Sequence, residues 1–171
     1  RLGPNEEGKV YFHDTSGRGI VYDGDPEKTA AAHIEPGTFT LGEIGYVDAQ
    51  GYLFITDRAS DMIVSGGFNI YPTEIENVIA DHPGVLEVAV FGVPHEKWGE
   101  TPLAMVRVKP GAQITETEII DLVRQRLGSA KKPSKVVFTA EPLPLSNVGK
   151  VLRSKLREPY WAGQDRRISG A

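Results

Sequence analysis

The 171-residue sequence predicts an α+β protein in which a small β-rich subdomain is followed by a ferredoxin-like βαββαβ domain. Two observations lead to this prediction. The 19 glycines and 12 prolines exceed average usage, which favours tight turns and short elements over a helix bundle. In the second part of the chain, short apolar runs and amphipathic stretches follow in the order strand, helix, strand, strand, helix, strand.

The first third of the chain is predicted to form short strands and turns. Runs rich in β-forming residues predict strands at Lys9–His13 and Gly19–Tyr22. The stretch Asp25–Ile34 opens with an Asp-Pro pair and continues into alanines, which predicts a short helix. Strands are also expected at Ile44–Asp48 and Tyr52–Thr56, and the short loop between them, which contains glycine, is typical of a hairpin.

From Met62 onward the pattern predicts the elements of the second domain. A helix at Pro72–Ile79 has proline near its start and apolar residues at core spacing. A second helix is expected to begin with Thr115-Glu-Thr-Glu118, the pattern of a capping box, and to carry Ile119, Val123 and Leu127 at four-residue spacing. Short apolar runs predict the strands, at residues 62–64, 88–91, 103–108 and 136–138. The polar run Asp57–Asp61 is the expected boundary between the two parts.

Composition excludes several classes of protein. The net charge of −4 argues against a nucleic-acid-binding protein, which would show a clustered basic excess. Without cysteine the chain has no disulfide, thiol nucleophile or zinc–thiolate site. No apolar run approaches the roughly 18 residues that a membrane span needs. Neither a glycosylation sequon nor a signal peptide occurs, so we expect a cytoplasmic protein. Because the chain opens at Arg1 in a polar, loop-like stretch without methionine, we expect it to be the downstream piece of a longer protein.

Two loops contain residues suited to binding anionic ligands. In Ser65–Asn69, Gly66 and Gly67 would expose backbone N–H groups and allow a phosphate or another ligand to approach, although a plain glycine turn would look the same. In Pro142–Lys150, a proline-rich approach leads to a flexible tip that carries an ammonium group. The plain alternative is a solvated loop lysine.

The histidines and one tryptophan are interpreted as structural when taken alone. His13, His33, His82 and His95 share no metal-ligand spacing, so no metal site is predicted. Trp98 stands in a polar loop, where a tryptophan more often packs on its own domain.

Four motifs, read in order, resemble the C-terminal part of AMP-forming acyl-CoA synthetases, members of the adenylate-forming ligase superfamily. They cover nearly the whole chain and stand at family-like spacing: Leu41–Gly45, Asp48–Arg58, Asp61–Glu76 and Pro144–Lys150. In that family, a large N-terminal domain binds ATP and a carboxylic acid, and a small C-terminal lid closes over it. The carboxylate attacks ATP to form acyl-AMP and pyrophosphate, and after the lid swings, the thiol of CoA displaces AMP.

The resemblance implies roles for residues of the adenylation step. Lys150 would be the catalytic residue, which stabilises charge as the acyl-adenylate forms. Glu43, where the family usually has aspartate, and Arg58 would bind the nucleotide. ATP and CoA would be substrates, and Mg²⁺ would arrive with ATP and be held by the N-terminal domain. No metal ligand is expected in this chain itself.

The resemblance also implies a domain division and a site for CoA. Residues 1–57 would be the last β-rich subdomain of the N-terminal region, 58–61 the hinge, with Ser60 and Asp61 in it, and 62–171 the lid. The residues expected to bind CoA are Gly66, Gly67, Trp98 and Lys132.

Three functions remain open from the sequence. The first is the C-terminal part of an acyl-CoA synthetase. This chain by itself would then be inactive, because the phosphate loop and the carboxylate pocket would belong to the N-terminal domain. The second is a non-catalytic ferredoxin-like binding module in which Lys150 is incidental. The third keeps the adenylation chemistry but passes the acyl group to a carrier protein; Lys132 favours free CoA, whose 3′-phosphate a carrier arm lacks.

Overall fold

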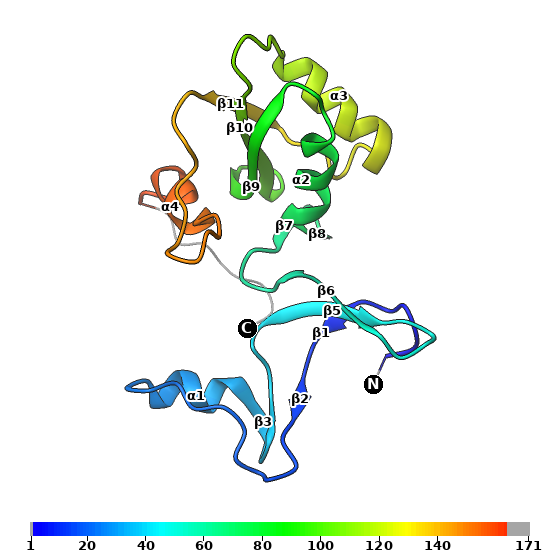
Figure 1. Cartoon of the computed structure of the whole chain (residues 1–171), viewed down its shortest axis with the longest axis vertical. Coiled ribbons are helices and arrows are strands. Elements are labelled where there is room, and N and C mark those ends of the chain that lie inside the picture. The colour runs from blue at the N-terminus through cyan, green and yellow to red at the C-terminus, as the bar shows by residue number, and fades with distance from the viewer. Residues whose placement is uncertain (1, 164–171) are drawn as a thin grey trace. The chain divides into compact units, whose positions relative to one another are not determined.

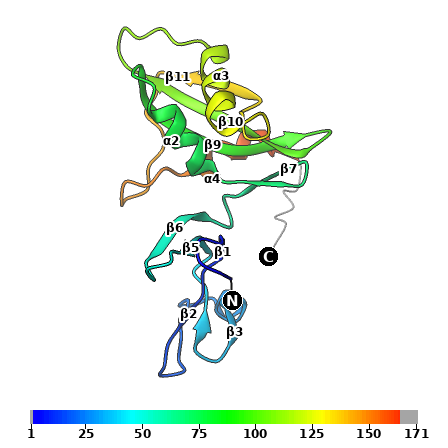
Figure 2. The same cartoon turned by 90° about the vertical axis from the view of Figure 1, so that its right-hand side faces the viewer.

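The structure, a computed structural model, describes residues 2–163 and divides the chain into two compact units, Arg1–Ser60 and Asp61–Ala171 (Figure 1 and Figure 2). The division falls inside the segment 58–61, for which we predict a hinge. Its action as a hinge stays a prediction. Among the described residues, no helix has the length and apolar character needed to cross a membrane.

The first unit consists of two small sheets and one helix. One sheet has the strand order β1-β5-β6 and the other β2-β4-β3. The β5–β6 hairpin is confirmed, and its turn is held by Asp48, whose carboxylate accepts hydrogen bonds from the N–H groups of Gln50 and Tyr52 at 2.9 and 2.8 Å. The elements are β1 (Gly8–Lys9), β2 (Phe12–His13), α1 (Pro26–Ala32), β3 (His33–Glu35), β4 (Thr38–Phe39), β5 (Glu43–Val47) and β6 (Leu53–Arg58).

Two strand predictions for this unit need correction. The run Lys9–His13 is not one strand, because it changes sheets: β1 pairs with β5, and β2 pairs with β4. The run Gly19–Tyr22 is not a strand at all. Gly19 has a positive φ of 69°, and the N–H of Tyr22 donates to the hydroxyl of Thr29 at 2.9 Å, so a side chain takes the place of a strand partner. The strands β3 and β4 were not predicted.

The second unit contains the predicted βαββαβ order and some additional elements. Its strands are β7 (Ile63–Ser65), β8 (Phe68–Ile70), β9 (Val85–His95), β10 (Gly99–Val108) and β11 (Lys135–Thr139), and its helices are α2 (Pro72–Ala80), α3 (Glu116–Leu127), α4 (Arg153–Arg157) and the 3₁₀ helix η1 (Glu158–Tyr160). Strand β10 pairs with β9 and β7 in antiparallel and with β11 in parallel, and α3 connects β10 to β11. The predicted α+β fold class is confirmed. Strand β8, α4 and η1 were not predicted.

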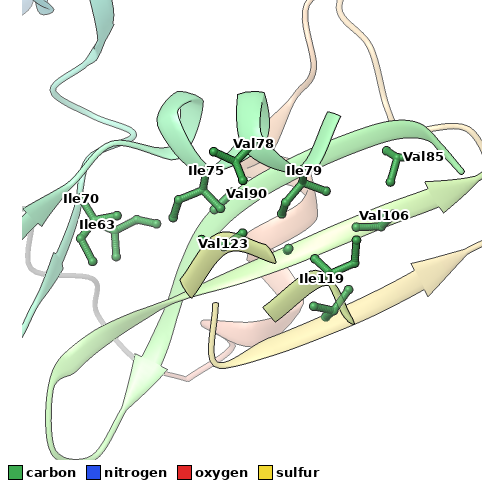
Figure 3. Close-up of a cluster of buried hydrophobic side chains, with 12 residues drawn as sticks. Ile63, Ile70, Ile75, Val78, Ile79, Val85, Val90, Val106, Ile119 and Val123 are labelled. Atoms are coloured by element: carbon green, nitrogen blue, oxygen red, sulfur yellow. The ribbon is translucent and has the colours of Figure 1, made fainter. Parts of the chain in front are cut away.

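The sheet of the second unit buries both of its faces, because side chains alternate along each strand. Val90, Val106 and Val136 pack with α2 and α3 in the larger core, much of which Figure 3 shows. On the opposite face, Phe91 and Leu103 lie in a second cluster to which α4 and η1 contribute Leu156 and Tyr160. The second cluster therefore fixes the segment that follows the Lys150 loop onto the sheet.

Candidate functional site

Lys150 lies in a tight loop closed by an antiparallel bridge between Leu145 and Val151. Within the loop, the N–H of Ser146 donates to the carbonyl of Lys150 at 2.7 Å, and the N–H of Lys150 donates to the hydroxyl of Ser146 at 3.1 Å. Gly149 donates to the Ser146 carbonyl at 2.9 Å. Lys150 is exposed. A short, hydrogen-bonded loop thus carries an ammonium group in contact with solvent.

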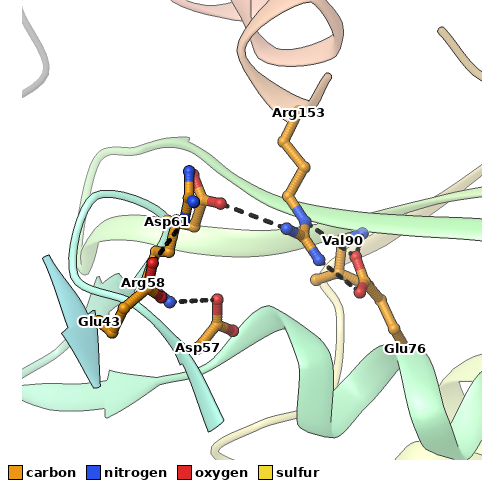
Figure 4. Close-up of polar contacts among 7 residues, drawn as sticks. All are labelled: Glu43, Asp57, Arg58, Asp61, Glu76, Val90 and Arg153. Atoms are coloured by element: carbon orange, nitrogen blue, oxygen red, sulfur yellow. Dashed lines mark hydrogen bonds and ion pairs between the residues drawn. The ribbon is translucent and has the colours of Figure 1, made fainter. Parts of the chain in front are cut away.

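Both arms of this loop are anchored in the second unit. On the first arm, Leu143 is buried, and its N–H lies 3.5 Å from a carboxylate oxygen of Glu87. The second arm runs into α4, whose first residue, Arg153, forms ion pairs with Glu76 and Asp61 (Figure 4). The loop that carries Lys150 therefore starts and ends on ordered parts of the sheet domain.

The two residues predicted to bind the nucleotide lie together in the first unit. Glu43 and Arg58 are register partners in β5 and β6, and Arg58 Nε donates to Glu43 Oε1 at 3.2 Å (Figure 4). The Arg58 side chain is half-exposed, whereas that of Glu43 is largely covered. The adjacent Asp57 is buried, and its carboxylate accepts a hydrogen bond from the Arg58 N–H at 2.7 Å. The hairpin thus presents a guanidinium group with an acid beside it.

The glycine loop and the tryptophan predicted to bind CoA are also neighbours. Gly66 and Gly67 form the turn between β7 and β8 with positive φ values of 56° and 88°. The Gly66 N–H donates to the Trp98 carbonyl at 3.0 Å, and a Cβ on Gly66 would lie only 2.7 Å from the Trp98 ring. Phe68, at the end of the same turn, is exposed. The β7–β8 turn and the β9–β10 turn, which carries the half-exposed Trp98, therefore meet at a surface that a ligand chain can approach closely.

The remaining predicted residues lie elsewhere in the chain. Ser60 is exposed at the end of the first unit, and Asp61 begins the second unit with a largely covered carboxylate paired to Arg153. Lys132 is partly buried in the connection between α3 and β11. The structure therefore brings Glu43 to Arg58 and the glycine loop to Trp98, but it places Lys150 and Lys132 on two different loops.

For the other charged side chains of residues 2–163, two properties could indicate a further site: a grouping that holds a metal ion, and a shifted pKa. Among residues 2–163, no group of three or more acidic or histidine side chains could hold a metal ion. The pKa of Asp14 lies below its ordinary value because the hydroxyl and the N–H of Ser16, together with the N–H of Gly19, donate to its carboxylate. This is a surface turn in the first unit.

The sequence of this second unit matches a known domain. A profile of the AMP-binding enzyme C-terminal domain matches residues 74–150, from the first turn of α2 through Lys150. Residues 74–150 belong to this domain family. The resemblance that the four motifs indicate, to the C-terminal part of adenylate-forming enzymes, is therefore confirmed.

Relatives extend the match over most of the chain. A long-chain-fatty-acid–CoA ligase of Mycobacterium tuberculosis is 49% identical over 137 residues, which are 80% of this chain and 27% of the relative. A fatty acid–[acyl-carrier-protein] ligase of Streptomyces coeruleorubidus is 39% identical over 168 residues, 98% of this chain and 32% of the relative. The crystal structure of ATP-bound MatB from Rhodopseudomonas palustris superposes with a TM-score of 0.82 at 37% identity, covering 93% of this chain and 31% of that one. The chain thus spans about a third or less of the length of these relatives.

Arg153, which lies just beyond the matched residues 74–150, was not predicted from the sequence. Its partners Glu76 and Asp61 stand 77 and 92 positions away, so no local pattern connects them. One signal was available: a basic residue at the first position of a helix opposes the helix dipole and therefore needs acidic partners. That signal requires α4 to be predicted, and a helix of five residues leaves too little pattern for this.

Proposed function

We propose that this chain supplies the C-terminal part of an AMP-forming acyl-CoA synthetase. In the first half-reaction, a carboxylate oxygen attacks the α-phosphorus of ATP, and the bond to pyrophosphate breaks. In the second, the thiol of CoA attacks the acyl carbonyl, loses its proton, and AMP leaves. Mg²⁺ would accompany ATP and be held by the N-terminal domain, together with the carboxylic acid.

The observation that carries the proposal is the exposed ammonium of Lys150 on a short, doubly anchored loop. As the carboxylate attacks, negative charge moves onto the α-phosphate oxygens and the leaving pyrophosphate. A cation held in place before the reaction stabilises that charge strongly in a site closed to water. Lys150 is therefore the proposed catalytic residue of adenylation.

The other predicted residues have supporting roles in this proposal. Arg58 would bind the nucleotide, and Glu43, paired with it, would accept hydrogen bonds from the ribose hydroxyls. The turn of Gly66 and Gly67, with Trp98 beside it, would line the path of the pantetheine chain. Lys132 would meet a CoA phosphate. The hinge, with Ser60 and Asp61, would move the second unit between the two half-reactions.

Lys150→Ala in the complete enzyme that carries this chain tests the proposal. Adenylation, followed by ATP–pyrophosphate exchange with a panel of fatty and aromatic acids, should fall by roughly 10²–10³-fold, the usual loss for one preorganised charge-stabilising group. The variant should convert preformed acyl-adenylate and CoA to thioester at close to the normal rate. Lys155→Ala, which removes another exposed lysine from the same segment, should leave both steps unchanged. Equal loss in both steps, or none in either, would contradict the proposed role.

The chain by itself should bind ATP weakly and form no acyl-adenylate, because the proposal assigns the phosphate loop and the carboxylate pocket to the N-terminal domain. Background exchange from purified residues 1–171 is the expected result. Robust exchange from these residues alone would show that the proposed division of the enzyme is wrong.

A second acceptor is favoured by one relative, the acyl-carrier-protein ligase of S. coeruleorubidus, which matches nearly the whole chain. In that alternative the same adenylate is attacked by the pantetheine thiol of a carrier protein. Offering free CoA and a carrier protein that bears the pantetheine arm with a free thiol in separate reactions distinguishes the acceptors. Lys132→Ala should raise KM for CoA if free CoA is the acceptor, and it should not change transfer to the carrier.

A further inference from the structure

Arg153 stands at the junction of the Lys150 loop and helix α4. It follows Lys150 by three positions and is the first residue of α4. Its guanidinium forms a fork on Glu76, with Nε 3.0 Å from Oε1 and Nη2 2.6 Å from Oε2. The remaining nitrogen, Nη1, lies 3.2 Å from Oδ2 of Asp61. Figure 4 shows the side chain reaching from α4 between these two acids.

The three charged groups are largely removed from water. The exposed fractions of the side chains are 12% for Arg153, 15% for Glu76 and 17% for Asp61. Coulomb attraction is stronger in such a place than on the surface, and a two-pronged guanidinium–carboxylate pair also fixes orientation. Lysine could offer only a point charge here.

Glu76 is in turn fixed to the sheet. Its Oε1 also accepts a hydrogen bond from the N–H of Val90 in β9 at 2.8 Å. Glu76 lies in α2, and Val90 is fully buried in the core between α2 and the sheet. A displacement of Arg153 would therefore break its pair with a carboxylate that is itself bonded to a buried strand. Through Arg153 and Glu76, the second arm of the Lys150 loop is connected to the larger core of the unit.

We propose that Arg153 is a positioning residue for Lys150. By pairing with Glu76 and Asp61, it sets where the second arm of the loop leaves the sheet domain and thereby where the Lys150 ammonium is held. The inference rests on the proposed function, since it needs Lys150 to act in adenylation. It also links the Lys150 loop to Asp61, which together with Ser60 belongs to the proposed hinge.

A double-mutant cycle in the complete enzyme tests this role. Single-turnover adenylation is measured for Arg153→Met, Lys150→Ala and the double variant. Arg153→Met should slow adenylation by about 10–100-fold, because a small misplacement of a catalytic group is enough to cause such losses. In the Lys150→Ala background, Arg153→Met should cause no further loss. Conversion of preformed acyl-adenylate to thioester should stay within about twofold of normal, because Lys150 is not proposed to act in that step and its misplacement should not slow it.

Companion variants separate positioning from general destabilisation. Arg153→Lys keeps the charge but not the fork, so it should recover only part of the adenylation rate. Glu76→Gln removes the charge that pairs with Arg153 but keeps a similar shape and an acceptor for the Val90 N–H. If Arg153→Met does not fold, Glu76→Gln should show the same loss of adenylation, and that loss should again depend on Lys150. Arg126→Met removes an arginine–carboxylate pair with Asp81 that involves no residue of the Lys150 loop or α4, and it should leave adenylation unchanged.

The outcomes distinguish the inference from the proposed function. If the losses from Arg153→Met and Lys150→Ala multiply, or if both half-reactions fall equally, Arg153 is a structural residue and the inference is wrong. If Lys150→Ala alone leaves adenylation unchanged, the proposed function is wrong instead. A loss from Arg153→Met or Glu76→Gln that disappears in the Lys150→Ala background supports the inference.

Discussion

Gly149 illustrates how a single backbone angle decides where a functional side chain lies. Its φ of 78° is in the left-handed region, and this conformation lets the chain turn back so that Lys150 can bond with Ser146. A Cβ at this position would meet no atom within 4 Å, so a side chain here would cost backbone strain but cause no clash. The glycine is therefore needed for conformation rather than for space.

Gly149→Ala should lower adenylation in the complete enzyme while destabilising the fold only slightly. The strain is about 1–2 kcal/mol, which the loop can relieve by shifting and so misplacing Lys150. We expect a roughly 10-fold lower adenylation rate and a near-normal thioester step. Gly111→Ala is a matched control, because Gly111 has the same φ of 78° and equally open surroundings but lies outside the Lys150 loop. An equal rate loss from both substitutions would contradict the role of Gly149.

Among the elements, helix α3 shows the closest agreement between pattern and structure. Thr115 accepts a hydrogen bond from the Glu118 N–H at 3.2 Å, and the Glu118 carboxylate accepts one from the Thr115 N–H at 3.4 Å. The capping box is therefore confirmed. The helix buries Ile119 and Val123, and its last residue, Leu127, is followed by Gly128, whose φ is 85°. Its start, its buried face and its end are all set by nearby residues.

Thr115→Ala should destabilise the second unit by about 1 kcal/mol, since it removes the acceptor for a backbone N–H at the helix start. Urea denaturation followed by circular dichroism measures this as a lower midpoint with an unchanged slope. Thr117→Ala removes a similar, exposed side chain from the same first turn without touching the cap and should change stability by less than about 0.5 kcal/mol. Similar losses for both would mean that the capping box contributes little.

For the whole molecule, the proposed function depends on the division between Ser60 and Asp61. The first unit contains the Glu43–Arg58 pair, and the second contains Lys150 and the turn of Gly66. If the two half-reactions need different placements of the second unit, the connection has to allow φ and ψ to change at a few positions. Ser60, exposed at the end of the first unit, is the position where we expect this change.

Ser60→Pro should affect the two half-reactions unequally. Proline holds φ near about −65° and also restricts the residue before it, so the complete enzyme should favour one placement of the second unit. Single-turnover measurements of adenylation and of thioester formation should then show a much larger loss in one step. Ser60→Ala, which removes the hydroxyl but keeps backbone freedom, should leave both rates nearly normal. Small and equal effects of the proline would place the hinge elsewhere.

The sequence by itself determined the features whose physical causes lie within a few residues. The α3 capping box, the helix with proline at its start at Pro72, the β5–β6 hairpin and the family motifs were all predictable, because caps, turns and side-chain periodicity act over one or two turns of chain. The same locality identified Gly66, Gly67 and Lys150 as candidates. Their assigned roles came from the family resemblance.

Only the tertiary structure decided which distant residues meet. Strands β3, β4 and β8 are two or three residues long and exist because a partner strand pairs with them. Helix α4 has five residues, too few to be stable alone, and it is held by packing on the sheet and by Arg153. The pairing of Arg153 with Glu76 and Asp61 spans 77 and 92 positions. Such contacts form only when the whole chain folds, because residues far apart in the sequence then come together. The residues close to each of them in the sequence do not specify that partner.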